Sequence, residues 1–239
     1  MNRRPAGRVA LPLVAAVVLA ACSQRPSTDD FFPLQPGLRW NYEVHEHSAV
    51  TDARRELSIR NLGAETREDR RYTRRLASDG NEYWLEVVDG RLQRSGLRTA
   101  IDREPRLDIT PLTVLKMPPE VGQAWEIETW PYILERIEPF RERFSQDRSK
   151  RVEMRMQVTA LDAMVEVPAG RFENCLRLDG EAVLNVLADA RIGASEVPIT
   201  QTEWYAPGVG LVLLEREEKL DTLQIVGGKV RMQLLSFED

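Results

Sequence analysis

Short runs in which apolar and polar residues alternate recur along the chain, and dipeptides typical of tight turns interrupt them. Residues 81–97, NEYWLEVVDGRLQRSGL, alternate on both sides of Asp89-Gly90. Alternation with a period of two is typical of a strand with one buried face, and Asp-Gly is typical of a two-residue hairpin turn. We therefore predict a β-hairpin here.

Two further stretches near the C-terminus follow the same pattern. Residues 202–217, TEWYAPGVGLVLLERE, alternate around Pro207-Gly208, which suits the central positions of a type II turn. Residues 221–237, DTLQIVGGKVRMQLLSF, alternate around Gly227-Gly228, and we place a third hairpin turn there. Hairpins of this kind predict an antiparallel sheet.

The pattern as a whole predicts a mainly β fold, either a single antiparallel open barrel or a strongly curved sheet. Helical spacing is confined to residues 131–144, PYILERIEPFRERF, where Pro139 would interrupt a helix. That stretch is a short helix or an irregular crossover. We expect at most one or two short helices in the chain.

One motif occurs twice. Proline, glycine and tryptophan recur with the same spacing in residues 33–40 and in residues 118–125, and each copy leads into a strand-like run, WNYEV or WEIET. We interpret the copies as similar starts of two strands, with chance similarity as the alternative. Two units do not establish a duplicated domain.

The N-terminal residues have the composition of a secretory leader. Three arginines precede an apolar run over residues 9–20, which is too short to span a bilayer comfortably. The run ends in Leu-Ala-Ala-Cys, residues 19–22, which resembles the lipobox of bacterial lipoproteins. The resemblance implies that residues 1–21 are a signal peptide cleaved between Ala21 and Cys22. It also implies that Cys22 carries a diacylglycerol thioether and an amino-terminal acyl chain such as palmitate.

Lipidation of Cys22 would make the lipid bilayer a partner of this protein, because more than one acyl chain gives stable anchoring. Ser23 at the next position resembles lipoproteins sorted to the outer membrane of Gram-negative bacteria. We expect residues 22–30 to form the lipidated terminus and a polar tether, and residues 31–239 to form a single antiparallel β domain facing the periplasm. An ordinary leader with a chance cysteine is the alternative.

The charge balance argues against nucleic acid as a partner. The chain has 33 basic and 38 acidic residues, and removal of the three leader arginines leaves 30 basic residues and a net charge of −8. Nucleic-acid-binding proteins favour a basic patch and a high pI. A hydrophobic fraction of 42% is enough for a packed core.

Cys175 is the cysteine that remains if Cys22 carries lipid, so it has no disulfide partner within the chain. It ends the stretch VPAGRFENC, residues 167–175. Either a bulge after Phe172 brings its side chain inward, or it lies on the second face of its strand. A catalytic thiol needs a base, and the histidines are distant in sequence. We interpret Cys175 as a packing residue.

His45 and His47 are two residues apart on a predicted strand, so both imidazoles point to one face and could meet one metal ion. A zinc or copper site needs further ligands, and apart from Cys175 no histidine or free cysteine is left to supply them. We interpret the pair as surface histidines and expect no metal site and no cofactor.

The sequence nominates no catalytic residue. It contains no Gly-x-Ser-x-Gly, no Ser-x-x-Lys, no phosphate-binding loop, no dinucleotide fingerprint and no Cys-x-x-Cys. The arginines of residues 53–75 are interleaved with acidic residues, which is typical of a solvated face. A patch for lipid headgroups or an acidic polymer is the alternative.

Two motifs carry a resemblance to a family. VPAGRFENCLRL, residues 167–178, and TEWYAPGVGLVLLE, residues 202–215, together resemble a motif pair of an uncharacterised family of bacterial envelope lipoproteins, and residues 31–44, FFPLQPGLRWNYEV, are similar to how such proteins begin. Residues 130–150 match nothing in it. The resemblance implies an antiparallel β-protein akin to the open barrels that carry lipoproteins across the periplasm. It implies no established activity.

These observations predict a membrane-anchored envelope lipoprotein that is not an enzyme. Its β domain would bind an apolar or lipidic ligand, or an envelope partner. Trp84, Trp204 and Tyr205 are the candidate residues of the ligand-binding face, with ordinary core packing as the alternative for them. A structural or assembly subunit of an envelope complex is the second hypothesis, and an envelope hydrolase is the third.

Overall fold

The structure is a computed structural model, and it describes residues 30–189 and 193–239. The predicted signal peptide, the cleavage site between Ala21 and Cys22, and the lipidation of Cys22 lie outside the described residues and stay predictions. Within the described ranges the chain forms fourteen strands and two 3₁₀-helices. No helix in these ranges is long and apolar enough to cross a membrane.

The strands fall into two groups that a crossover separates. The first group is β1 (Arg39–Ser48), β2 (Asp52–Arg67), β3 (Arg70–Ala77), β4 (Glu82–Val88), β5 (Arg91–Arg98), β6 (Arg106–Lys116) and β7 (Ala124–Thr129). The crossover contains the short strands β8 (Glu135–Arg136) and β9 (Glu142–Arg143) and the helices η1 (Phe144–Gln146) and η2 (Arg148–Lys150). The second group is β10 (Val152–Val167), β11 (Gly170–Asp189), β12 (Gly193–Ala206), β13 (Gly210–Asp221) and β14 (Ile225–Glu238).

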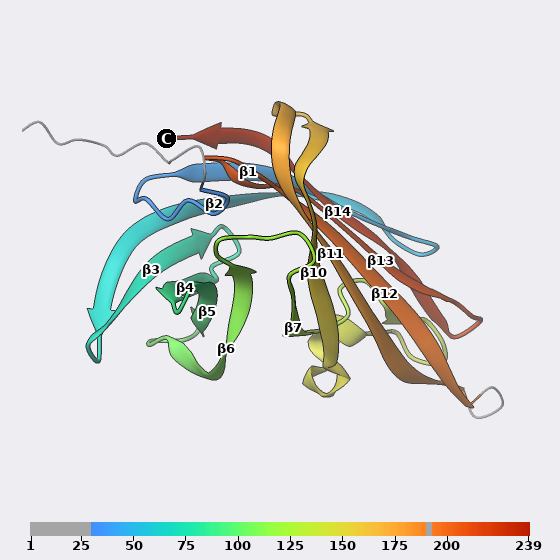
Figure 1. The fold of residues 1–239 in the computed structure, drawn as a ribbon. Coiled ribbons are helices and arrows are strands. Elements are labelled where there is room, and N and C mark those ends of the chain that lie inside the picture. Colours follow the sequence, from blue (N-terminus) through green and yellow to red (C-terminus); the bar gives the residue numbers. More distant parts are fainter. Residues whose placement is uncertain (1–29, 190–192) are drawn as a thin grey trace, which may run out of the picture.

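The strands form one antiparallel sheet that nearly closes into a barrel (Figure 1). Their order is β6-β5-β4-β3-β2-β1-β14-β13-β12-β11-β10-β7, with β8 pairing with β14 and β9. The first long strand therefore pairs with the last, and the end strands β6 and β7 meet at one unsealed seam. The predicted fold class, an antiparallel open barrel with at most two short helices, is confirmed.

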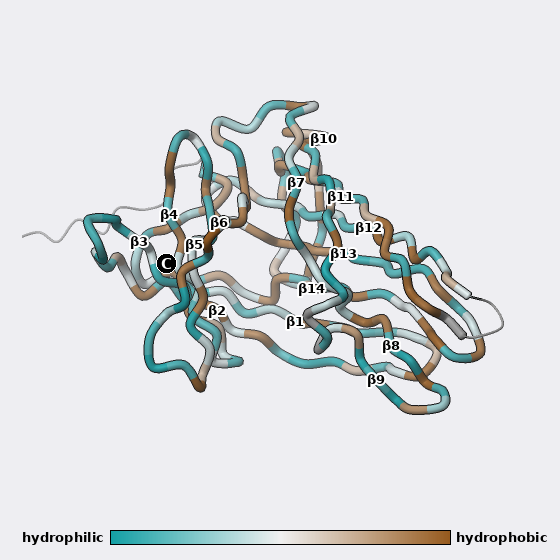
Figure 2. Tube along the Cα trace, turned by 90° about the horizontal axis from the view of Figure 1, so that it is seen from below, coloured by the Kyte–Doolittle hydropathy of each residue, from teal (hydrophilic) through white to brown (hydrophobic). Residues whose placement is uncertain are grey.

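Along the strands, every second side chain points toward the barrel interior. In β12 every second residue from Val197 to Tyr205 is buried, and the residues between them are exposed or half-buried. Figure 2 shows hydrophobic and hydrophilic segments following one another along the strands. A strand of this kind buries one face and leaves the other to solvent or to a covering segment.

Two of the three predicted hairpin turns are confirmed. Asp89-Gly90 joins β4 to β5, and both residues have positive φ, as a tight hairpin turn requires. Pro207-Gly208 lies in the turn between β12 and β13. The sequence therefore identified these hairpins from local chemistry alone.

The third predicted turn is wrong. Gly227 and Gly228 lie inside β14, and the turn falls at residues 222–224. A Cβ atom on Gly227 would lie 1.9 Å from the main-chain oxygen of Glu218, and one on Gly228 would lie 2.4 Å from the main-chain oxygen of His47. These glycines therefore allow neighbouring backbones to approach closely and do not make a turn.

The repeated Pro-Gly-Trp motif marks the starts of β1 and β7, as predicted, and both tryptophans are buried. Each indole N–H donates to a distant main-chain carbonyl. Trp40 donates to Val209 at 2.7 Å, and Trp125 donates to Thr113 at 3.1 Å. The motif thus supplies a large side chain that ties the start of a strand to another part of the barrel.

Side chains bridge the seam where the backbones of β6 and β7 do not pair. The bond from Trp125 to Thr113 crosses it, and the ammonium of Lys116 donates to the carbonyl of Ala124 at 2.8 Å. Both bridges lie at the end of the seam where a short loop connects the two strands. The seam is therefore held by side chains at this end.

The crossover, residues 130–150, runs into the barrel. Ile133, Leu134 and Phe144 are at most 2% exposed, and the last two belong to the largest cluster of buried hydrophobic residues. The predicted irregular crossover is confirmed, and its buried residues Leu134 and Phe144 pack with residues of the strands in that cluster.

The first described residues, 30–37, lie against one end of the barrel. The main-chain N–H of Gly208 donates to the carbonyl of Asp30 at 2.8 Å. The guanidinium of Arg75 donates to the carbonyl of Pro33 at 2.8 Å, and burial lowers the pKa of Arg75 to about 10. The described chain therefore begins beside the turn between β12 and β13.

Candidate functional site

A buried ion pair on the barrel wall holds the crossover in place. Arg216 and Glu218 lie on β13 with fully buried side chains, and Nε of Arg216 donates to Oε1 of Glu218 at 2.9 Å. The carboxylate also accepts from the main-chain N–H groups of Tyr132 at 2.6 Å, Ile133 at 3.1 Å and Leu134 at 2.8 Å. A buried charge is tolerated when a counter-charge and several hydrogen bonds compensate it, as they do here. Glu218 therefore fixes the start of the crossover.

The guanidinium of Arg216 links the crossover to neighbouring strands. It donates to the carbonyl of Trp130 at 2.8 Å and to the side-chain oxygen of Gln201 at 2.9 Å. Gln201 donates in turn to the carboxylate of Glu203, which also accepts from the hydroxyl of Tyr205. Burial raises the pKa of Glu203 despite these bonds, and it raises that of Tyr205 well above its ordinary value. These side chains are hydrogen-bonded to one another, so their role is to hold the crossover and the neighbouring strands together.

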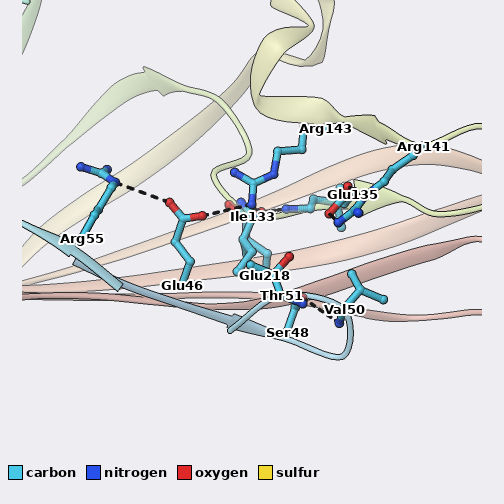
Figure 3. A network of polar contacts seen from close by, with 11 residues as sticks. Glu46, Ser48, Val50, Thr51, Arg55, Ile133, Glu135, Arg141, Arg143 and Glu218 are labelled. Atoms are coloured by element: carbon cyan, nitrogen blue, oxygen red, sulfur yellow. Dashed lines mark hydrogen bonds and ion pairs between the residues drawn. The ribbon is translucent and has the colours of Figure 1, made fainter. Parts of the chain in front are cut away.

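Ion pairs at the mouth of the barrel attach the far end of the crossover (Figure 3). Glu46 on β1 pairs with Arg143 on β9 at 3.1 Å and lies 4.0 Å from Arg55 on β2. Glu135 on β8 accepts from Arg141 just before β9. The crossover is thus bound to the wall at its start and again near its end.

A cavity of about 420 Å³ remains between the crossover and the strands β5 and β6. Trp130, which directly follows β7, forms one of its walls, so the cavity lies along the seam beyond the two bridges. We call it the seam cavity. Its lining residues are Arg94, Leu97, Arg106, Asp108, Trp130 and Ser145.

Two guanidinium groups line the seam cavity, and each is paired with a carboxylate. Arg94 lies 3.3 Å from Asp108, and Arg106 lies 3.1 Å from Asp102. The indole nitrogen of Trp130 is shielded from solvent and has no hydrogen-bond partner among the described residues. A buried donor left without a partner costs about 1–3 kcal/mol. The cavity therefore combines an aromatic wall with two guanidinium groups, each of which contacts a carboxylate.

The three aromatic residues that the sequence nominated lie in different surroundings. Trp84 on β4 is 2% exposed and packs on Tyr72, with ring centroids 5.4 Å apart. Trp204 and Tyr205 are consecutive on β12, so they point to opposite faces and belong to two separate hydrophobic clusters. The structure does not gather them on one face, and none of them lines the seam cavity. Ligand contact by these residues stays a prediction.

The sequence did not nominate the residues of the seam cavity. Trp130 is the one whose type signals a binding surface, but it stands in a stretch without a periodic pattern. Arg94 and Arg106 come from hairpin strands on which charged residues alternate with apolar ones in the ordinary way. Only closure of the sheet brings these strands to the crossover.

Cys175 lies in a hydrophobic cluster with its side chain 0% exposed. The strand pairing steps from Val165 opposite Phe172 to Ala163 opposite Cys175, so β11 has one extra residue, and Asn174 has a positive φ of 54°. This is the bulge after Phe172 that the sequence left as one of two alternatives. Burial raises the pKa of the Cys175 thiol to about 11. These are the surroundings of a packing residue.

His45 and His47 lie on the same face of β1, and Asp52 on β2 completes a group of three. Nε2 of His45 is 2.6 Å from Oδ1 of Asp52, and Nδ1 of His47 is 3.9 Å from the same oxygen. The hydrogen bond from His45 lowers the pKa of the Asp52 carboxyl. The sequence pattern gave no sign of Asp52, because the register of the β1–β2 ladder decides which residue stands opposite His47.

Comparisons with known proteins identify no family for this chain. No family model matches it, and no curated protein matches it. Among solved structures, it is similar to a predicted lipoprotein of Parabacteroides distasonis ATCC 8503, with 14% identity over 90% of this chain and 100% of that one, and a TM-score of 0.48. It is also similar to a predicted exported protein with a YmcC-like fold from Bacteroides fragilis NCTC 9343, with 14% identity over 87% and 99% of the two chains and a TM-score of 0.46. With TM-scores below 0.5, neither likeness extends to function.

Proposed function

We propose that this chain is a lipid-anchored protein of the bacterial envelope, and that its β domain binds an acidic amphiphile with the headgroup in the seam cavity. The lipobox-like residues at Cys22 support the anchor, and Ser23 supports the outer membrane as its place. The observation that carries the binding role is a cavity of about 420 Å³ whose lining joins the side chains of Arg94 and Arg106 to Leu97 and Trp130.

The chemistry of the seam cavity suits a phosphate or carboxylate headgroup. Arg94 and Arg106 can each present two parallel N–H groups to such an anion, which would compete with the carboxylates of Asp108 and Asp102 for them. Leu97 and the indole ring of Trp130 supply apolar surface for the adjoining part of the molecule. A cavity of about 420 Å³ falls within the range of small-ligand sites.

The position of the first described residues is compatible with a ligand taken from a membrane. The carbonyl of Asp30 accepts a hydrogen bond from the N–H of Gly208. An anchor at Cys22 would therefore tether the barrel through residues 22–29. A fully extended chain spans at most about 3.6 Å per residue, so this tether reaches at most about 29 Å. The barrel would therefore stay close to the lipid surface.

Native mass spectrometry with lipid extraction tests the proposal. We would purify the Cys22→Ser form gently from the periplasm, since it lacks the acyl chains that would mask a bound lipid. An extra mass that extracts as an acidic lipid is expected in this form. Arg94→Gln and Arg106→Gln should each reduce its occupancy, and Arg60→Gln on the exposed face of β2 should not.

Two results would contradict this proposal. One is a mass without adduct, and the other is an adduct whose occupancy is the same in the cavity variants as in the control. Either would favour the second candidate, in which the protein is an assembly subunit of an envelope complex.

Exposed hydrophobic residues on the β5–β6 hairpin favour that second candidate. Ile101 is 93% exposed and Ile109 is fully exposed, next to the free edge of β6. Pro111 and the irregular pairing of β6 with β5 make strand addition unfavourable at this edge, so a partner would contact side chains. A photo-crosslinker placed at Ile109 in the intact envelope should then capture one protein, and one placed at Val183 on β11 should not.

A further inference from the structure

The two histidines of the chain and one carboxylate converge on the face of the sheet that is turned away from the barrel interior. On β1 the interior-facing residues Val44 and Glu46 alternate with His45 and His47. Asp52 stands directly opposite His47 in the ladder with β2. Residues directly opposite one another in an antiparallel pair share a face, so the ladder itself holds Asp52 beside the imidazoles.

The separations of the donor atoms fit a single transition-metal ion. One nitrogen of each imidazole and one carboxylate oxygen of Asp52 all lie within 4.8 Å of one another. In a tetrahedral site with bonds of about 2.0–2.1 Å, the donor atoms lie roughly 3.3 Å apart. The distances from Asp52 to His45 and His47, 2.6 and 3.9 Å, lie on either side of that value. Small side-chain rotations would make them equal.

Neighbouring cations do not exclude a metal ion, because each lies near a carboxylate, although Glu217 is shared by Lys219 and Lys229. Arg231 and Lys229 stand opposite His45 and His47 on β14. Arg231 pairs with Glu215, and Lys229 lies 3.7 Å from Glu217.

The cation on the other side of His45 is also paired. Arg54 stands opposite His45 on β2 and lies 3.6 Å from Glu43. The positive charges around the two imidazoles are therefore compensated locally, and the carboxylate of Asp52 remains for the metal ion.

Open space adjoins the two imidazoles. His45 and His47 line a hollow of about 420 Å³ on this face, together with Thr202 and Glu215. A metal ion held by three protein ligands keeps at least one position for water or for a donor from another molecule. The hollow leaves that position accessible.

We infer that His45, His47 and Asp52 form a site for a divalent transition-metal ion, with an open coordination position toward the hollow. Two imidazoles and a carboxylate are typical ligands of Zn²⁺ and Cu²⁺, and the order of affinities among divalent ions favours Cu²⁺ over Zn²⁺ at a site of this kind. The site lies on the opposite face of the wall from the seam cavity and does not depend on the proposed function.

Calorimetric titration of the full chain with Zn²⁺ and with Cu²⁺ tests this inference, using protein stripped with a chelator and carrying no histidine tag. One ion per chain is the expected result, and the Cu²⁺ form should show nitrogen coupling in its electron paramagnetic resonance spectrum. His47→Ala and Asp52→Asn should each weaken the affinity at least tenfold. Glu56→Gln, a control on the same strand and face, should leave it unchanged.

Thermal unfolding of each metal-free variant would verify that it is folded before the titrations are compared. Lack of uptake by the wild-type chain at about 0.1 mM free ion would overturn the inference, since binding that weak gives no measurable stabilisation. Uptake that His47→Ala and Asp52→Asn leave unchanged would also overturn it, because the ion would then bind elsewhere.

Discussion

Leu134 donates its main-chain N–H to the buried carboxylate of Glu218 at 2.8 Å, although the two residues are 84 positions apart in the chain. This bond, with those from Tyr132 and Ile133, turns the chain after β7 into the barrel. The space left beside the crossover is the seam cavity. Glu218 thus helps to position the candidate ligand site, together with the bond from Arg216 to Trp130 and the ion pair of Glu46 with Arg143.

Replacement of Glu218 should therefore destabilise the whole fold. Glu218→Gln leaves Arg216 buried without its counter-charge and removes an acceptor from the crossover, and loss of one partner of a buried ion pair costs about 3–5 kcal/mol. Urea unfolding measures the change. Glu217→Gln, on the adjacent residue of the opposite face, is the matched control and should stay within about 0.5 kcal/mol of wild type. If Glu218→Gln lowered the free energy of unfolding by less than about 0.5 kcal/mol, the assigned role would be contradicted.

Glu203 should make stability depend on pH in a defined direction. Its pKa is raised in the fold by burial, so the folded state keeps a proton that the unfolded state releases above about pH 4.3. The folded state therefore loses stability, relative to the unfolded state, as pH rises from that value through the raised pKa. Glu203→Gln removes this dependence.

Thermal unfolding at about pH 4 and about pH 7 measures the effect. As the pH rises from about 4 to about 7, wild type should lose stability that Glu203→Gln keeps, so the difference between them should shift in favour of the variant. Glu196→Gln, on the exposed face of the same strand, should show no such change. A constant difference between Glu203→Gln and wild type would mean that burial does not control this carboxyl.

Cys175 should be unreactive in the native protein. The side chain is fully buried, and a thiol whose pKa is about 11 has little thiolate at neutral pH. In the Cys22→Ser background, an aromatic disulfide reagent should label Cys175 only as fast as the protein unfolds, and at once in denaturant. Rapid labelling of the folded protein would show that the cluster around Cys175 opens locally.

Loss of the hydrogen bond from Trp125 should loosen the seam between β6 and β7. Trp125→Phe keeps the ring but removes the bond to Thr113, and the loss of a hydrogen bond of this kind costs about 1 kcal/mol. Hydrogen exchange should then accelerate in β6 and β7. Trp40→Phe is the matched variant, because it removes the bond to Val209 and should affect residues 30–37 instead. Equal exchange patterns in the two variants would contradict the bridging role.

Cys22→Ser should release the protein from the membrane. Without the thioether the acyl chains cannot be attached, and the mildly acidic chain has no excess of basic residues to hold it at an anionic surface. Fractionation of cells that produce this variant should recover a soluble periplasmic protein, whereas wild type stays with the membranes. Retention of the variant in the membrane fraction would mean that a second contact anchors it.

The strands could be predicted because they depend on local properties. Alternation and the dipeptides Asp89-Gly90 and Pro207-Gly208 specify strands and turns within a few residues, and the structure has those hairpins where the pattern placed them. The turn predicted at Gly227-Gly228 is wrong. A glycine pair is typical both of a turn and of a close approach between strands, and only the neighbouring backbone distinguishes the two.

The grouping of Trp84, Trp204 and Tyr205 was an interpretation that residue type suggested. Strand alternation by itself places the consecutive residues Trp204 and Tyr205 on opposite faces. Burial of aromatic side chains is common in cores, so residue type alone carried little information about a binding face. The seam cavity instead uses Trp130, from a stretch without a pattern.

By itself, the sequence determined the β class, the hairpin turns at Asp89-Gly90 and Pro207-Gly208, and the starts of β1 and β7. The tertiary structure alone decided where the sheet closes, how the crossover fills the barrel and that Asp52 meets His45 and His47. The reason is physical: alternation and turn chemistry act between residues that are near in the chain, whereas the register of distant strands and the burial of charges such as Glu218 depend on contacts that form only when the whole sheet has closed.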